Sequence, residues 1–273
     1  MKVSAANLLK HWIVAALCLC VALPAVPAEP VQVHHSEGTV HGFLALRNKA
    51  GRLLAVGDLT QSVHGDRVTS HLNYRFKDGS IDEETAVFSQ RENFQLVSDH
   101  HVQKGPSFPH PIDLTIDVQS GQVTVRSSGK DGKEEVNNEH LDLPPDLANG
   151  IVLTIVKNIP RETHEIKLPL LVATPKPRIV QLVISAQDED PFSLAGSNRK
   201  AMRYEIKFEL GGLAGVVAPL IGKQPPPISI WISGGEAPAF VKEEGFSYEG
   251  GPIWVAELTS PVWPRSTKSH TKK

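Results

Sequence analysis

Histidine is the residue type that most invites a chemical interpretation in this chain of 273 residues, which contains 12 of them. Two adjacent pairs occur, His34-His35 and His100-His101, and imidazole binds metals and moves protons near neutral pH. Successive residues of a strand point to opposite faces, so neither pair can chelate one ion from within a strand. A metal ion could be chelated only by histidines from different segments, such as His100 with His110. Since no His-Glu-x-x-His motif is present, we expect no metal site and no cofactor.

Serine and glycine motifs give no stronger indication of chemistry. The sequence lacks Gly-x-Ser-x-Gly, and Ser233 precedes two glycines without the strand-turn-helix setting of a catalytic serine. Residues 211–215 superficially resemble a phosphate-binding loop, but the glycine spacing of a dinucleotide site is absent and Pro219 would interrupt the required helix. We therefore assign no catalytic residue and no cofactor-binding residue.

Two acidic clusters, Asp82-Glu83-Glu84 and Asp188-Glu189-Asp190, contain oxygen ligands that calcium prefers. Neither has the spacing of a calcium-binding loop. Both flank predicted strands, so we interpret them as solvated charge at strand ends, and Pro191 after the second cluster indicates a turn.

The beginning of the chain has the order of charge, apolar core and small residues that is typical of a secretory signal. Lys2 and Lys10 precede an apolar run over residues 12–23, and Ala28 ends the small-residue region. The run is about a dozen residues long, whereas a spanning helix needs about 20. We predict a signal peptide over residues 1–28, cleaved after Ala28, and a periplasmic or extracellular mature protein that does not span the membrane.

Composition narrows the remaining functional classes. Cys18 and Cys20 both lie in the predicted signal, so the mature chain would have no thiol for a disulfide or a thiolate nucleophile. Basic and acidic side chains are nearly balanced, 28 against 30, and the basic ones are dispersed, so we expect no nucleic-acid partner. No apolar residue follows Trp263-Pro264, and residues 265–273 are predicted to be a basic disordered tail.

The elements that must position the side chains are predicted to be mostly strands. Short runs of alternating apolar and polar residues, separated by turn residues, fill residues 39–125, and similar runs resume at residue 166. We predict one β-rich domain over residues 29–264, with about 10 to 12 strands in a strongly curved, half-barrel-like antiparallel sheet. One face of this sheet should bury Leu72, Tyr74, Phe76, Leu114, Ile116 and Trp231.

One central helix is predicted near residues 145–158, packed on the concave face of the sheet. Two prolines and Asp146 suit its first turn, and Ile151, Ile155 and Ile159 recur every four residues as one apolar stripe. Gly150 and the β-branched residues oppose the helix.

Residues 210–223 are rich in glycine and carry no charge until Lys223. Such a stretch either packs under the domain as a buried turn or lines an apolar cavity. Aromatic side chains elsewhere could supply further contact area. The predicted ligand-binding residues are Leu213, Val216, Val217, Leu220, Trp231, Phe240 and Trp254.

The order of signal peptide, antiparallel meander, central helix and tryptophan-bearing strands resembles an uncharacterised family of exported bacterial proteins, a domain of unknown function. The resemblance covers most of the mature chain, and its most specific segments are residues 76–85, 143–150, 230–233 and 237–240. The layout is also similar to the half-barrel of bacterial lipoprotein carriers, in which a sheet wraps a helix and leaves an apolar cleft. That similarity implies the fold and transfers no functional residue.

These observations favour a non-enzymatic protein of the cell envelope. It would bind a lipid or another apolar or amphipathic ligand, or an envelope partner, although an ordinary filled core would give the same apolar pattern. The alternative is a hydrolase acting on an envelope polymer or ester, with groups drawn from His100, His101, His110 and nearby carboxylates. Convergence of these groups in one cleft would favour the hydrolase, and dispersal over opposite sheet faces would count against it.

Overall fold

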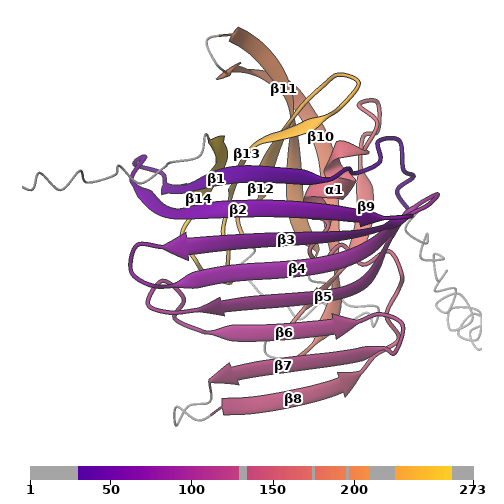
Figure 1. The fold of residues 1–273 in the computed structure, drawn as a ribbon, viewed down its shortest axis with the longest axis vertical. Helices are drawn as coiled ribbons and strands as arrows, with labels where there is room; N and C mark the ends of the chain where they lie inside the picture. The colour runs from indigo at the N-terminus through magenta and orange to yellow at the C-terminus, as the bar shows by residue number, and fades with distance from the viewer. Residues whose placement is uncertain (1–29, 129–133, 174–175, 195–196, 210–224, 260–273) are drawn as a thin grey trace, which may run out of the picture.

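A computed structural model describes residues 30–128, 134–173, 176–194, 197–209 and 225–259. These residues form one antiparallel sheet of 14 strands and a single short helix (Figure 1). The elements in chain order are β1 Val40–Asn48, β2 Leu53–His64, β3 Arg67–Phe76, β4 Ile81–Gln90, β5 Phe94–Lys104, β6 Ile112–Asp117, β7 Gln122–Ser128, β8 Glu134–His140, α1 Val152–Lys157, β9 Ile166–Val172, β10 Arg178–Leu194, β11 Ser197–Glu209, β12 Ile228–Ser233, β13 Ala239–Gly245 and β14 Trp254–Thr259. Within the same residues, no helix is long and apolar enough to cross a membrane.

The sheet is a meander with β1 near its middle. Strands β2 to β8 follow one another on one side of β1, and β14 back to β9 follow on the other. The two end strands, β8 and β9, do not pair, so the sheet is open. In Figure 1, β1 to β8 run across the view and the strands of the second half pass behind them at a steep angle. The prediction of a mainly β, antiparallel protein is confirmed.

Alternation along the strands separates the two faces of the sheet largely as predicted. Tyr74, Phe76, Leu114 and Ile116 are buried, and Leu72 on the same face is half-buried. Their neighbours along β3 and β6 point outward because successive side chains of a strand alternate.

The prediction that Trp231 lies on the buried face is wrong. Ile230 and Ile232, on either side of it, are buried in the core, so alternation places the indole on the outer face. There its Nε1 donates a hydrogen bond to Asp190 Oδ2 at 2.8 Å. The Lys242 ammonium lies 3.9 Å from the ring centroid, which is a cation–π contact. An aromatic residue in an alternating strand does not by itself indicate which face is buried.

The helix is shorter than predicted, covering Val152–Lys157 in place of residues 145–158. Gly150 has a φ of 65°, a left-handed conformation that a right-handed helix cannot contain, and the preceding residues form turns. Ile155 and Val156 are nevertheless buried, in a cluster that also contains apolar side chains from both halves of the sheet. The isoleucine stripe therefore indicated the packing face correctly, but not the length of the helix.

Two groups of apolar side chains fill the interior. The large cluster joins β3 to β7, the segment Leu143–Ile159 and strands β9 to β12. The aromatic cluster joins the first strands to β14, with Phe76, Phe108 and Trp254 at its centre. The Phe76 ring centroid lies 5.3 Å from each of the other two. The two halves of the sheet are thus held together through side chains at two levels.

At the outer edge of β9, an asparagine side chain forms the hydrogen bonds that a neighbouring strand would form. Asn149 is 8% exposed; its Nδ2 donates to the Leu171 carbonyl at 3.0 Å, and its Oδ1 accepts from the Leu171 N–H at 2.8 Å. The Ala148 N–H donates to the carbonyl of Pro169 at 2.9 Å. Pro169 itself fits an end strand because it has no N–H for a ladder.

We expect Asn149→Ala to destabilise the protein by about 3 kcal/mol, since it leaves both polar backbone groups of Leu171 buried without a partner. Urea denaturation monitored by circular dichroism measures the change. Asn48→Ala is the matched control, because Asn48 Oδ1 also accepts two backbone hydrogen bonds, but exposed ones that water can replace. Equal losses in the two variants would contradict the edge-covering role of Asn149.

The second acidic cluster lies inside a strand, and the predicted turn at Pro191 is wrong. The register of β10 against β11 shifts between Ala186 and Glu189, and the hairpin then continues to its end. Neighbouring strands pair only with the nearer half of this hairpin, so its far end projects from the sheet (Figure 1). A β-bulge accommodates the acidic residues that sequence reasoning assigned to a turn.

Candidate functional site

Carboxyl groups and one histidine gather on the inner face of the sheet, between the two apolar clusters. On β4, Asp82 and Glu84 share the parity of Ala86 and Phe88, both fully buried, and therefore point inward. The prediction that this first acidic cluster is solvated charge holds only for Glu83, whose side chain points outward. We call the inward group of Asp82, Glu84, Asp99, His101 and Glu243 the acidic layer.

A β-bulge on β5 brings two members of the acidic layer to the inner face. Phe94 and Leu96 point inward, and the pairing with β4 then shifts by one residue. After the shift, the inward positions are Asp99, His101 and Gln103. Because an extra residue reverses which side chains face inward, simple alternation from Phe94 would have placed Asp99 outside.

The fifth member comes from the opposite half of the sheet. Glu243 on β13 pairs with Ile230 of β12, whose side chain lies in the large cluster, so Glu243 points toward the interior. Electrostatic interaction of Glu243 with Glu84, Asp82 and Tyr74 shows that these groups lie close to one another. Residues far apart in the chain thus meet in one layer.

His101 and Asp82 form the one ion pair of the acidic layer among the described residues. His101 Nε2 lies 2.8 Å from Asp82 Oδ1. Gln103 Nε2 donates to Asp82 Oδ2 at 3.0 Å and to the Ser247 carbonyl at 2.8 Å. The Asp82 carboxylate is therefore well satisfied.

Asp99 is the opposite case. Its side chain belongs to a residue only 1% exposed, and no hydrogen bond of acceptable geometry reaches either carboxyl oxygen. Gly150 lies against it, since a Cβ at that position would be 2.8 Å from Asp99 Oδ1. An unpartnered buried carboxyl costs free energy, because it has given up water without receiving a donor.

Burial shifts the protonation of the acidic layer. It raises the pKa of Asp99 well above its ordinary value, with the neighbouring Glu84 adding to the effect and with His101 and the adjacent N–H of His100 opposing it. Burial likewise raises the pKa of Glu84, and it raises the pKa of Glu243 to about 7, with Glu84 and Asp82 contributing. These carboxyls hold protons at a pH where exposed ones are ionised.

The pKa of the His101 imidazole is set by two opposing effects. Burial alone would lower the pKa of His101, but the hydrogen bond to Asp82 and the nearby carboxylates raise it to about 9. His101 is therefore a cation at neutral pH. It is the only basic side chain of the acidic layer, which contains four carboxyls.

The acidic layer is not sealed. Glu84 and Glu243 are half-buried, and the His101 side chain is 25% exposed although it points inward. Leu72 and Phe240, which flank the layer on the inner face, are also half-buried. The described residues contain no group of three or more His, Cys, Asp or Glu side chains arranged to hold a metal ion.

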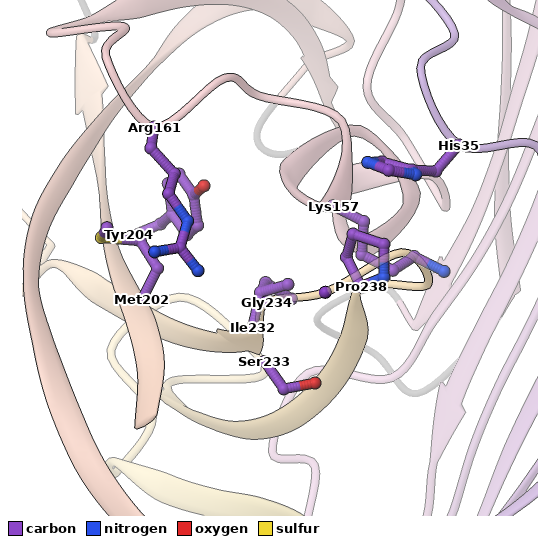
Figure 2. A pocket seen from close by; sticks show the side chains of 10 residues that line it. His35, Lys157, Arg161, Met202, Tyr204, Ile232, Ser233, Gly234 and Pro238 are labelled. Carbon is purple, nitrogen blue, oxygen red and sulfur yellow. The ribbon is translucent and has the colours of Figure 1, made fainter. Parts of the chain in front are cut away.

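A second feature is a pocket where the N-terminal segment, the end of α1 and the β12–β13 turn meet (Figure 2). We call it the rim pocket. It encloses about 120 Å³ and adjoins a wider depression of about 330 Å³ that shares His35 and Lys157 with it. The residues that line it are His35, Lys157, Arg161, Met202, Tyr204, Ile232, Ser233, Gly234, Gly235 and Pro238.

Three of the predicted ligand-binding residues, Trp231, Phe240 and Trp254, belong to the described part of the chain. Leu213, Val216, Val217 and Leu220 lie outside the described residues. Trp231 is on the outer face, Trp254 is buried in the aromatic cluster, and Phe240 lies on the inner face against both clusters. Phe240 thus packs against the cluster that contains Trp254, and Trp231 lies apart from both.

The three histidines considered for catalysis are dispersed. His100 points outward, where its Nε2 lies 3.0 Å from Asp113 Oδ1, and His110 is exposed in the β5–β6 loop. His101 alone reaches the interior. The dispersal of the histidines counts against the hydrolase alternative, whereas the approach of His101 to Asp82, at 2.8 Å, is a convergence of the kind that this alternative requires.

No protein-family model matches the chain. No curated protein matches it either. Among solved structures, it is similar to a crystal structure described as a β-barrel-like protein of domain of unknown function DUF1849 from Brucella abortus. The identity is 8%, the match covers 84% of this chain and 100% of that one, and the TM-score is 0.45. A likeness of this size says nothing about ligand or activity, and the resemblance to lipoprotein carriers stays a prediction.

Proposed function

We propose that this chain is an exported binding protein that holds an amphipathic ligand with a cationic group on the concave face of its sheet. The observation that carries the proposal is Asp99, a buried carboxyl without a partner inside a layer of three further carboxyls. Export is supported by the order of charge, apolar core and small residues over positions 1–28.

The charge of the acidic layer defines the head group. Four carboxyls face one imidazole, and His101 is already paired with Asp82. A bound ammonium group would supply the missing positive charge and the missing hydrogen-bond donors. It would also favour the ionised form of the carboxyls, so binding should release protons.

The surroundings of the layer define the remainder of the ligand. The large cluster lies on one side and the aromatic cluster on the other, and half-buried Leu72 and Phe240 present apolar surface beside the carboxyls. An apolar chain next to the head group would bury this surface, at about 25 cal/mol for each Å² removed from water. A purely structural role explains the layer less well, because apolar side chains of similar volume would fill the interior without the cost of desolvating carboxyls.

Three probes of equal chain length test the proposal: dodecylamine, dodecanol and dodecanoic acid, each used below its aggregation concentration. Tryptophan fluorescence at pH 6.5 should show dodecylamine binding most tightly and dodecanoic acid most weakly. The variant Glu84→Gln/Asp99→Asn keeps side-chain volume and should weaken dodecylamine at least ten-fold. Glu83→Gln, one residue away on the outer face, is the matched control and should bind as the parent does.

Calorimetry gives an independent measure of the same site. Titration of dodecylamine in two buffers of different ionisation enthalpy should show proton release by the parent protein and less by the double variant. Equal affinity for the amine and the alcohol would overturn the cationic head group. An unchanged affinity in the double variant would remove the acidic layer as the site.

A further inference from the structure

The rim pocket has the opposite charge character from the acidic layer. Its lining includes three basic side chains, His35, Lys157 and Arg161, and no acidic one. They come from the N-terminal segment, α1 and the turn after it, and the facing wall is the β12–β13 turn (Figure 2). Segments distant in the chain therefore bring basic groups to one small space.

Carboxylates outside the pocket lining hold two of these cations in place. Lys157 Nζ lies 2.5 Å from Glu37 Oε1, and Arg161 Nη1 lies 2.6 Å from Glu189 Oε1. Each partner occupies one donor of its cation, whereas an ammonium has three N–H donors and a guanidinium has five. Among the described residues, neither cation has a further hydrogen bond or ion pair, so the other donors are available to a ligand.

Glycine at position 234 makes room for the guanidinium. A Cβ there would overlap Nη2 of Arg161, so the guanidinium lies directly against the turn. Figure 2 shows the Arg161 side chain extending toward Gly234 across the pocket. Arg161 thus lies between Glu189 and the glycine turn with 53% of its side chain exposed, so its guanidinium can contact a planar or tetrahedral oxyanion.

The remaining wall is mostly apolar. Met202, Ile232 and Pro238 line it, together with Tyr204, whose hydroxyl donates to the Ile159 carbonyl at 3.1 Å. A volume of about 120 Å³ corresponds to roughly four water molecules at about 30 Å³ each. That space fits one oxyanion and a few carbon atoms, and it is too small for a whole lipid.

We propose that the rim pocket binds the oxyanion of a small organic molecule, a phosphate monoester or a carboxylate, through Arg161 and Lys157. This site is separate from the proposed cation site, and neither proposal depends on the other. The geometry assigns the oxyanion to the end of the pocket formed by Arg161 and Gly234, and the organic group to the wall of Met202, Ile232 and Pro238.

Butyl phosphate, inorganic phosphate and butyrate are the probes, titrated into the full mature chain and followed by calorimetry and by amide chemical shifts. Butyl phosphate should bind most tightly, with the largest shifts at Gly234 and Gly235. Arg161→Gln should weaken it at least ten-fold. Gly234→Ala should do the same without removing a charge, because the added methyl group displaces the guanidinium.

Lys200→Gln is the matched control. Lys200 also approaches Glu189, at 4.0 Å, but does not line the pocket, so its loss should leave affinity unchanged. Equal weakening by Lys200→Gln and Arg161→Gln would show that the anion responds only to surface charge and would overturn the site. Equal affinity for inorganic and butyl phosphate would contradict the organic group, and absence of binding by every probe at millimolar concentration would reject the pocket.

Discussion

The free energy of unfolding should fall steadily as the pH rises from 4.5 to about 9, because the native protein holds protons that the unfolded chain has lost. The Glu243 carboxyl keeps its proton up to a pKa of about 7, against an ordinary value of 4.5. Ionising it costs more in the folded state, so stability declines between those two values. Glu84 and Asp99, whose pKa values are also raised, act in the same direction.

His101 extends the decline to higher pH. Its folded pKa of about 9 lies above its ordinary value of 6.5, so its contribution to stability is complete below pH 6.5 and is lost as the pH rises through 9. At about 1.4 kcal/mol for each unit of pKa, Glu243 and His101 each account for a change on the order of 3 kcal/mol. Urea denaturation at pH 5, 7 and 9, monitored by tryptophan fluorescence, measures the trend.

Glu243→Gln isolates one part of this dependence. The amide cannot ionise, so the variant should be more stable than the parent at pH 8 by about 3 kcal/mol, with a smaller slope between pH 4.5 and 7. Glu244→Gln is the matched control with the opposite sign. Burial alone would raise the pKa of Glu244, but hydrogen bonds from Lys49 and Lys242 lower it below its ordinary value, so loss of this carboxylate should destabilise the protein at pH 8. A Glu243→Gln variant less stable than the parent at pH 8 would show that the carboxyl is satisfied, contrary to the acidic layer described above.

Gly150→Ala should be the most damaging small substitution, with a loss of about 3 to 4 kcal/mol. The residue has a φ of 65°, and an added Cβ would lie 2.6 Å from Ala86 Cβ and 2.8 Å from Asp99 Oδ1. Backbone strain and overlap in a packed interior therefore act together. The same overlap would displace Asp99, so dodecylamine binding should weaken as well.

Gly51→Ala separates the two causes. Gly51 also has a positive φ, 80°, but nothing lies within 4 Å of its Cβ position. Its substitution should cost only the strain, about 1 kcal/mol. Thermal denaturation of both variants measures the difference in stability. Similar melting temperatures would mean that the side chains beside Gly150 can move to accommodate the added methyl group.

The alternating strands were predictable because a half-buried strand has an apolar residue at every second position, on the face that it buries. Tyr74 and Phe76 on β3 and Leu114 and Ile116 on β6 show this pattern, and the structure buries them. Strand β8 was missed because Val136 is the only apolar residue in it, so no alternation marks it. The helix was overextended because two prolines and Asp146 resemble a first helical turn, whereas Gly150, which follows them, has a left-handed backbone conformation that ends any such turn before Ile151.

The acidic layer was only partly within reach of the sequence. Asp82 and Glu84 lie an even number of positions before Ala86 and Phe88, so alternation alone would place them on the buried face. Their charge led us to expect that they are exposed. Asp99 and His101 could not be placed, since the bulge on β5 reverses parity without a distinctive residue. Glu243 joins them only through the folding of one half of the sheet over the other, which no local pattern encodes.

The place of β1 between β2 and β14 has a consequence for the order of folding. In a chain that emerges with its N-terminus first, strands β1 to β8 can pair one after another, each with the strand just before it. The second edge of β1 must wait for β14, Trp254–Thr259, near the other end of the chain. Closing so long a loop is slow, and until it happens β1 presents an unpaired edge to any other extended chain nearby. β14 therefore protects the second edge of β1, and a chain truncated before residue 254 would keep the meander of β1 to β8 with an aggregation-prone edge.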